Sequence, residues 1–340
     1  MSGESTYQPP YTITSEILTR VAQISEAMGR LNVLTDRARE LRLRRITRIR
    51  TVRGSLAIEG GTLSEAQITA ILDGRRVIAP PRAVQEARNA LAAYDHFESW
   101  RPEVEKDLLE AHRMLMAGLI DEAGMYRRGG MGVMAGTQVI HMAPPADRVP
   151  QLMSDLCRWL VLATTDAHPL IAGSVFHYEF EFIHPFIDGN GRLGRLWQSL
   201  ILTRWNPLFA NIPVESLVFE HQHEYYEALQ ESTNRTDSEP FIAFMLRMIL
   251  DAVTTTAPQV TPQVGELVLA LQEEMSREAL QTTLGLQDRK SFRERYLRPA
   301  LADGLIEMTI PDKPNSRLQK YRLTDKGRQW LAEQRKNSDK

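Results

Sequence analysis

Helical periodicity is the sequence feature that most limits what this chain can fold into. Apolar residues three and four apart recur at about Arg82–Trp100, Val104–Met116, Arg148–Leu162, Pro169–Ile183, Asn190–Trp205, Ser216–Ser232 and Pro240–Val253. A helix packed on a core requires this spacing. We therefore predict an all-α, mainly helical protein. One short β-hairpin is expected at 129–145, where four glycines surround Val133, Val139 and Ile140.

The N-terminal part has the same periodicity from Ser15 to Arg53 and predicts two helices or one long bent helix. Eight arginines lie in its second half, at positions 37, 39, 42, 44, 45, 48, 50 and 53. They predict either a solvated face paired with acidic neighbours or a nucleic-acid surface, although no aromatic residue is interleaved to stack on bases. Next, Thr62-Leu63-Ser64-Glu65 has a capping-box pattern and predicts a helix to about Leu72.

The C-terminal part differs in its pattern. Thr254–Pro262 contains threonines and two prolines and predicts a linker. Three helical stretches, two short strands and a last helix follow, which is typical of a winged helix. We predict an N-terminal helical region at 1–98, a central helical core at 99–254, a linker at 255–262 and a winged-helix-like domain at 263–336.

Composition limits the partners of the chain. The 340 residues exceed what one core usually organises, and the formal charge of −2 gives no overall attraction to nucleic acid or anionic membranes. The single cysteine, Cys157, lies in an apolar run and is expected to be an inert core thiol rather than a reactive one. No leader pattern or apolar run of membrane-spanning length occurs, so we expect a cytoplasmic protein without membrane contact.

Residues 184–195 read His-Pro-Phe-Ile-Asp-Gly-Asn-Gly-Arg-Leu-Gly-Arg and carry the chemistry. An apolar helix ends next to His184, and Pro185 disfavours its continuation. Gly189-Asn190-Gly191 then forms a tight turn that leads to the next helix. Backbone N–H groups at such a helix start bind phosphate, and glycine lets the oxygens approach closely. Arg192 and Arg195 project from one face near the same end, where they could hold further phosphate oxygens. Asp188 suits Mg²⁺, and His184 suits proton removal from a hydroxyl.

Each residue alone has an ordinary structural interpretation, but the whole stretch resembles the signature of the Fic family of protein adenylyltransferases. The resemblance implies AMP transfer from ATP to a Ser, Thr or Tyr hydroxyl of a target protein, or self-modification, with release of pyrophosphate. It implies that His184 is the general base, that Asp188 binds Mg²⁺, and that Phe186 anchors the loop. The implied ATP-binding residues are Gly189, Asn190, Gly191, Arg192, Leu193, Gly194 and Arg195.

Ser55-Leu-Ala-Ile-Glu59-Gly60 resembles the inhibitory motif of the same family. This resemblance implies that Glu59 pairs with Arg195 and occupies the place of the γ-phosphate. The alternative is an ordinary helix end with Gly60 in the left-handed position. In some relatives the equivalent glutamate also supports removal of AMP, which stays a secondary hypothesis.

Two further elements are assigned by resemblance. The segment from Gly124 to Pro145 resembles the family's flap, a hairpin that aligns a target segment by strand pairing, with Val133, Val139, Ile140 and His141 in its arms. A hairpin without special function is the alternative. Tyr225 and Tyr226 lie where relatives contact adenine, although such tyrosines are more often half-buried packing residues.

Other functions compete with AMP transfer, and they include a DNA-binding role. The fragment 262–340 has 15 basic and 12 acidic residues, a net of only +3. Binding of DNA through 263–336 and docking or homodimer formation therefore both stay open. A DNA-binding regulator whose Fic core senses nucleotide is one alternative function. Transfer of a different phosphate-containing group is another.

Overall fold

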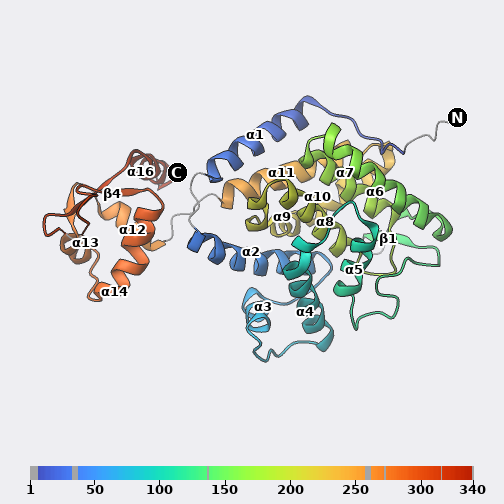
Figure 1. Cartoon of the computed structure of the whole chain (residues 1–340), viewed down its shortest axis with the longest axis horizontal. Helices are drawn as coiled ribbons and strands as arrows, with labels where there is room; N and C mark the ends of the chain where they lie inside the picture. Colours follow the sequence, from blue (N-terminus) through green and yellow to red (C-terminus); the bar gives the residue numbers. More distant parts are fainter. Residues whose placement is uncertain are drawn as a thin grey trace. The chain divides into compact units, whose positions relative to one another are not determined.

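The computed structural model describes residues 7–32, 37–135, 138–256, 262–271, 273–314 and 316–338. The chain divides into two compact units, 1–256 and 257–340 (Figure 1). The first unit contains eleven α-helices among its described residues: α1 (Ser15–Asn32), α2 (Arg37–Ile58), α3 (Glu65–Leu72), α4 (Pro81–His96), α5 (Glu105–Leu115), α6 (Val149–Asp166), α7 (Pro169–Ile183), α8 (Asn190–Trp205), α9 (Val214–Glu220), α10 (Gln222–Arg235) and α11 (Glu239–Thr256). The prediction of a mainly helical protein is confirmed.

The helices of the first unit pack around α7. Nearly every residue of α7 is buried, including the polar Ser174, His177 and Glu181, and α8 and α11 lie against it. A helix buried on nearly all sides needs a mostly apolar sequence, and α7 is mostly apolar apart from these few polar side chains. Helices α1 and α11 lie side by side (Figure 1), so the N-terminal helices share one core with the central helices.

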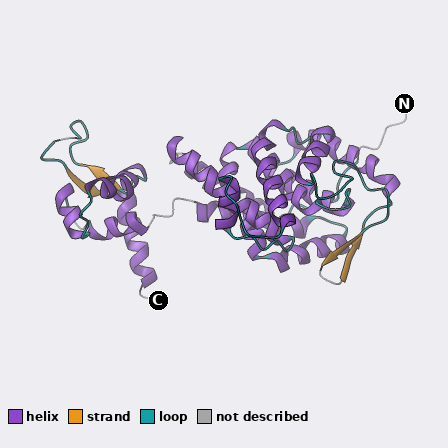
Figure 2. Ribbon diagram, turned by 90° about the horizontal axis from the view of Figure 1, so that it is seen from below, coloured by secondary structure: helices purple, strands orange, loops and turns teal. Residues whose placement is uncertain are grey.

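A two-stranded antiparallel hairpin is the only sheet in the described part of the first unit. Its strands are β1 (Gly132–Ala135) and β2 (Gln138–Met142), and it lies at the edge of the helical unit (Figure 2). The predicted hairpin is therefore present. The side chains of Val133, Val139, Ile140 and His141 lie outside what the structure describes.

Two local predictions were wrong. The pattern Ser216–Ser232 forms two helices, α9 and α10, because the backbone of His221 leaves the helical region while the apolar periodicity continues across it. The capping box of α3 is not formed by Thr62 and Glu65. Ser64 is the N-cap, its Oγ accepts from the Gln67 N–H, and the Gln67 side chain accepts from the Ser64 N–H.

The described arginines of α2 follow the prediction of a solvated, paired face. Arg44 pairs with Glu98 at 3.2 Å, and Arg45 and Arg48 pair with Asp73 and Asp95. Exposed pairs of this kind contribute little stability each, about 0 to 1 kcal/mol. They nevertheless fix which neighbours α2 contacts on the side of α3 and α4.

The second unit has a core of its own and a three-stranded antiparallel sheet in the order β3-β5-β4. The core includes Leu267, Phe292 and Tyr321. The elements are α12 (Pro262–Ala270), β3 (Met275–Ser276), α13 (Arg277–Thr283), α14 (Arg289–Phe292), a π-helical turn η4 (Arg293–Leu297), α15 (Arg298–Ala302), β4 (Ile306–Met308), β5 (Lys320–Leu323) and α16 (Asp325–Ser338). The two-residue strand β3 escaped prediction, and the winged-helix assignment stays a prediction.

No described helix combines the length and apolar character that crossing a bilayer needs. Cys157 is buried in α6, and burial raises the pKa of its thiol to about 12. A thiol with so high a pKa holds almost no nucleophilic thiolate near neutral pH, as expected for an inert core residue.

Candidate active site

The loop that begins at His184 is held in a strained conformation. His184 ends α7 with φ 48° and ψ 62°, a left-handed conformation that costs a residue with a Cβ of order 1 kcal/mol or more. Its backbone N–H still donates to the Phe180 carbonyl at 3.0 Å, so the chain leaves the helix sharply after one last hydrogen bond. The turn directs the following five residues across the end of α7 toward the start of α8.

Arg127 holds this turn from the other side. Its guanidinium donates to the carbonyls of His184, Ile183 and Pro144 at 2.7, 3.2 and 2.6 Å, and its own N–H donates to the Pro185 carbonyl at 2.9 Å. The residue is 3% exposed, and burial lowers its pKa. Arg127 thus ties the base of the hairpin to the histidine loop, which the sequence pattern did not reveal.

The loop also closes on itself. The Asn190 amide accepts from the Phe186 N–H at 2.9 Å and donates to the Phe186 carbonyl at 2.8 Å. The Phe186 ring is fully buried and stacks on His112 at 3.6 Å between centroids. The side chain of Asn190 is therefore engaged by the loop, while Phe186 anchors it as expected.

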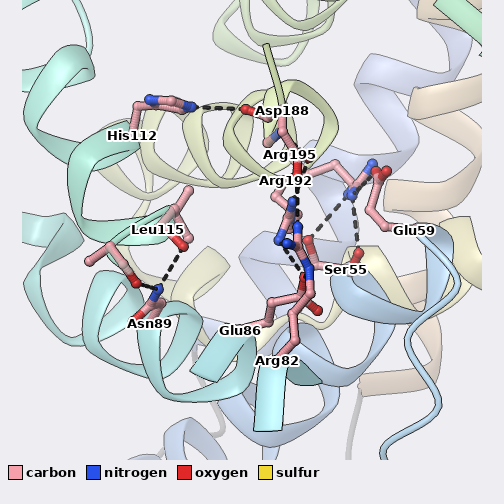
Figure 3. A network of polar contacts seen from close by, with 12 residues as sticks. Ser55, Glu59, Arg82, Glu86, Asn89, His112, Leu115, Asp188, Arg192 and Arg195 are labelled. Carbon is pink, nitrogen blue, oxygen red and sulfur yellow. Dashed lines mark hydrogen bonds and ion pairs between the residues drawn. The ribbon is translucent and has the colours of Figure 1, made fainter. Parts of the chain in front are cut away.

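His112, which the sequence reasoning missed, fixes the next residue of the loop. Its Nδ1 accepts from the Gly124 N–H at 2.8 Å, so Nε2 carries the proton and donates to the Asp188 carbonyl at 2.9 Å. Burial lowers the pKa of His112 to about 4, which keeps the ring neutral in this role. Figure 3 shows His112 beside Asp188.

Gly189 and Gly191 form the start of α8. Gly189 is the N-cap and has φ 85°, which favours glycine. At Gly191, an added Cβ would lie 2.3 Å from the Glu59 Oε1 atom. The carboxylate of Glu59 therefore lies directly against the helix start, where unpaired N–H groups and the helix dipole favour an anion.

Arg195 is buried and paired with the inhibitory segment. Its NH2 donates to Glu59 Oε1 at 2.8 Å and to the Ser55 carbonyl at 3.0 Å, and its Nε donates to Ser55 Oγ at 3.3 Å (Figure 3). Arg195 is 2% exposed; burial by itself lowers its pKa, but the charge and hydrogen bond of Glu59, together with Tyr225 and Glu181, more than offset this and raise the pKa above its usual value. The predicted pair between Glu59 and Arg195 is present.

The end of α2 also has the alternative feature, a left-handed glycine. Gly60 has φ 84°, its N–H donates to the Ala57 carbonyl, and the Gly61 N–H donates to the Leu56 carbonyl. This Schellman motif terminates α2. The two interpretations are compatible, because the cap places Glu59 on the last turn, from which its side chain reaches Arg195.

Arg192 belongs to a different network, on the side of α4. Its NH2 contacts Asp188 Oδ1 at 2.8 Å, and its NH1 lies 3.6 Å from Glu86 Oε1. Arg82 contacts both Glu86 at 3.2 Å and Asp188 at 3.1 Å (Figure 3). Arg82 and Glu86 are site residues that no motif signalled, because they come from a helix about a hundred positions earlier.

Glu181 lies close to His184 and is influenced by the charge of Arg195. Its Oε2 lies 3.8 Å from His184 Nδ1, and its Oε1 lies 3.9 Å from the Nε2 of the buried His177. Burial raises the pKa of Glu181 to about 8, Arg195 lowers it and Glu59 raises it. A carboxyl group that titrates near neutral pH thus lies beside the candidate base.

Several residues implied in ATP binding are structural in this conformation. Leu193 is fully buried, and a Cβ on Gly194 would lie 2.9 Å from the His177 ring, so Gly194 permits close packing of α7 and α8. Tyr225 is 1% exposed and its hydroxyl lies 3.2 Å from His177 Nε2. Tyr226 is half-buried next to it, with 5.3 Å between the ring centroids.

Asp188 is the carboxylate that the motif itself provides for a metal. Among the described residues, no group of three or more His, Cys, Asp or Glu side chains is arranged to hold a metal. Asp188 is 38% exposed and is held by two arginines and the Gly189 N–H. One carboxylate fits Mg²⁺, which is usually held in proteins by one or two carboxylates, phosphate oxygens and water.

Comparisons with known proteins agree with this geometry. Residues 102–202 match the model of the Fic/DOC family, and residues 262–324 match the model of the C-terminal domain of Fic-like proteins, named for filamentation induced by cAMP. The chain is similar to a protein adenylyltransferase Fic of Nematostella vectensis, with 31% identity over 57% of this chain and 45% of that protein. It spans about half or less of the length of such curated relatives.

Solved structures match more of the chain. Fic-1 of C. elegans (residues 134–508) is 26% identical, covers 71% of both chains and has a TM-score of 0.61. The crystal structure of a Fic family protein from Desulfovibrio desulfuricans G20 is 53% identical, covers 94% of this chain and 99% of that one, and has a TM-score of 0.71. With that identity over almost all of both chains, this protein belongs to the Fic family.

Proposed function

We propose that this chain is a protein adenylyltransferase that transfers AMP from ATP to a hydroxyl group of a target protein or of another copy of itself. One observation carries the proposal. His184 lies at the head of a loop that ends in a glycine-rich helix start with two buried arginines. The names of the curated relatives support the same reaction class.

The proposed reaction uses each group according to its chemistry. His184 accepts the proton of the target Ser, Thr or Tyr hydroxyl, whose oxygen bonds to the α-phosphorus of ATP. The bond from that phosphorus to the bridging oxygen breaks, and pyrophosphate leaves. Positioning and charge stabilisation supply most of the acceleration in such chemistry, and the N–H groups of Gly189 and Gly191 together with Arg192 supply both.

Mg²⁺ is the expected metal, and Asp188 is the residue that would hold it. When bound, the ion supplies positive charge against the phosphate oxygens. Asp188 contacts Arg82 and Arg192 in the present conformation, so those two arginines must turn away from it, or share it, when nucleotide and metal enter. Tyr226 is the side chain that we propose for contact with adenine, because Tyr225 is enclosed in the core.

Self-inhibition is the second part of the proposal. Arg195 is the residue proposed for the γ-phosphate, and its guanidinium already donates to three oxygens, the Ser55 carbonyl, Ser55 Oγ and Glu59 Oε1. Glu59 also lies against Gly191, so a phosphate at the helix start would meet a like charge. Activity of the resting protein should be low, and release of Glu59 should raise it. Because Glu59 lies at the nucleotide site, removal of AMP remains a secondary candidate.

The DNA-binding alternative is weaker for an electrostatic reason. Arg293 in η4 and Arg298 at the start of α15 both pair with Glu294, at 2.8 and 2.9 Å. Their charge is thus partly neutralised before any phosphate approaches. Docking of a target protein or of a second copy is the role that we favour for the second unit.

One experiment tests both parts. Wild-type protein, Glu59→Gly and His184→Ala are incubated with Mg²⁺, a cell lysate and ATP labelled at the α- or the γ-phosphate. We expect label from the α-position only, at least tenfold more in Glu59→Gly and none in His184→Ala, whose ATP binding by equilibrium dialysis stays intact.

The outcomes separate the hypotheses. Label from the γ-phosphate would indicate transfer of a phosphate group instead. Equal labelling by wild type and Glu59→Gly would contradict inhibition by Glu59 without contradicting transfer. Labelling that survives in His184→Ala would exclude this histidine as the base.

A further inference from the structure

A cavity lies near the contact of Arg195 with Ser55 and Glu59. It has a volume of about 460 Å³ and is lined by residues of α2, α3, α4, α8 and the segment 209–215. This volume falls within the range of about 300 to 1,000 Å³ typical of small-molecule sites. None of the residues proposed for ATP, metal or base lines it. It is therefore a separate site from the histidine loop.

The cavity and the inhibitory contact share the same two helices. On α2, Thr47 and Thr51 line the cavity, and Ser55 follows one turn later against Arg195. On α8, Ser199 and Thr203 line the cavity one and two turns after Arg195. A group that occupies the cavity thus lies one helical turn from the Ser55–Arg195 contact on both helices.

Three residues of the cavity wall have buried polar atoms without a hydrogen-bond partner among the described residues. Glu215 is 2% exposed; its Oε1 accepts from Tyr94 at 3.0 Å and from Ser199 at 2.7 Å, but its Oε2 is buried without a hydrogen-bond partner among the described residues. The same is true of Thr203 Oγ1 and Arg48 Nε. Buried polar atoms normally have partners, so these side chains would gain hydrogen bonds if a polar ligand in the cavity turned them toward it.

The charges favour an anion at the arginine side. Arg44, Arg45 and Arg48 line the cavity together with the carboxyl groups of Asp95, Glu98 and Glu215. Burial raises the pKa of the Glu215 carboxyl group, which shifts it toward the protonated form. Burial, followed by the charge of the neighbouring Arg45, lowers the pKa of Arg48, which pairs with Asp95.

The remaining lining is aromatic and hydroxylic. Tyr94, Phe97 and Phe209 contribute rings, and Thr47, Thr51 and Ser199 contribute hydroxyl groups. Guanidinium groups bind phosphate in a matched, often bidentate geometry, and rings pack against a flat heterocycle. The lining therefore combines an anion-binding side with a surface for a planar, hydrogen-bonding group.

We propose that this cavity binds a small aromatic phosphate of the nucleoside monophosphate class, and that its occupancy loosens the hold of α2 on Arg195. The arginines of α2 now bind Asp73, Asp95 and Glu98. A phosphate competes for the same guanidinium groups and so weakens these anchors. The binding site stands by itself, whereas its regulatory effect rests on the proposed transferase function.

The structure contains a mechanical connection between the cavity and the inhibitory segment. A Cβ added to Gly54 would lie 2.6 Å from the Glu215 carbonyl oxygen, so the backbones of α2 and α9 touch at this point. Gly54 directly precedes Ser55, and Glu215 supplies the buried carboxyl group of the cavity. A ligand that shifts Glu215 or the arginines must therefore shift the turn of α2 that carries Ser55 and Glu59.

Binding is tested first, on the full chain, by isothermal titration calorimetry with AMP, GMP, CMP and phenyl phosphate. We expect at least one probe to bind, its affinity to fall tenfold or more in an Arg45→Ala/Arg48→Ala variant, and to persist in Arg192→Ala, which alters only the motif site. Thr203→Phe, which fills the cavity, should act like the double variant. Circular dichroism checks that each variant is folded.

Two results would overturn the site. Loss of binding in Arg192→Ala but not in the double arginine variant would place the nucleotide at the motif alone. If no probe shows saturable binding at millimolar concentration, the cavity is not a binding site for this class of ligand.

The regulatory effect is measured by α-phosphate labelling with and without the bound probe. We expect labelling by wild type to rise at least threefold and labelling by Glu59→Gly to show no rise. An unchanged or lower wild-type rate with the probe bound would refute the coupling and leave the site. Absence of labelling in Glu59→Gly would contradict the transferase function, while the calorimetric result would still decide on the site.

Discussion

The two arginines of the motif, Arg192 and Arg195, have partners that come from different parts of the molecule. Arg192 contacts Asp188 on its own loop and Glu86 on α4, which are both parts of the site. Arg195 contacts Ser55 and Glu59, which come from α2, about 140 positions away in the chain. The first network can rearrange within the site, whereas the second depends on where a separate helix lies. This difference makes Arg195 the arginine through which α2 can control the protein.

The largest effect is expected when one carboxylate partner of each arginine is removed by substitution. Glu59→Gly should tighten binding of a non-hydrolysable ATP analogue by about ten- to a hundredfold, because a charge-assisted hydrogen bond at a buried group contributes about 1.5–3 kcal/mol. The matched variant Glu86→Gln should change the affinity by less than about threefold. Isothermal titration calorimetry measures both. Equal effects of the two substitutions would show that the arginines are equivalent.

A smaller effect is expected from the other residue that holds Arg195. Ser55→Ala removes the hydroxyl that contacts Nε and keeps the backbone carbonyl that contacts NH2. We expect α-phosphate labelling to rise about fivefold, which corresponds to one neutral hydrogen bond of about 1 kcal/mol. Ser216→Ala, which removes a hydroxyl contact to the Arg50 carbonyl farther from Arg195, serves as the control. The same rise in the control would indicate general loosening of α2.

The smallest effect concerns the pH dependence of stability near Arg195. The folded state raises the pKa of Glu181 from its ordinary value of 4.5 to about 8, so the fold prefers the protonated acid. Its contribution to stability is fully present below about pH 4.5 and is lost as the pH rises through 8. Glu181→Gln mimics the protonated acid.

The difference in Tm between Glu181→Gln and wild type should therefore become more favourable to the variant by several °C as the pH rises from 5 to 8. Calorimetric melting at both values measures it. Glu179 provides the comparison, since burial raises its pKa only to about 7, and Glu179→Gln should show its change at lower pH. A Tm difference that does not change with pH would show that Glu181 is ionised in the fold throughout.

The helices and the motif could be predicted from the sequence because both depend on residues that are close together in the chain. The bounds of α7 and α8 agree with prediction to the residue, since an apolar run followed by Pro185 and a glycine turn specifies where one helix ends and the next begins. It failed where a local signal is missing. The break at His221 lies within a continuous periodic pattern, and β3 is only two residues long.

The sequence by itself determined the mainly helical fold, the order of the residues in the motif and the glycine cap that ends α2 at Gly60, since periodicity and backbone preference act over a few residues. Only the tertiary structure decided which groups meet. Packing brings Arg82 and Glu86 to Asp188, Arg127 to the carbonyl of His184, and Glu59 to Arg195. Apolar burial drives this packing but does not depend on direction, so charges distant in the chain find their partners only when the helices have assembled.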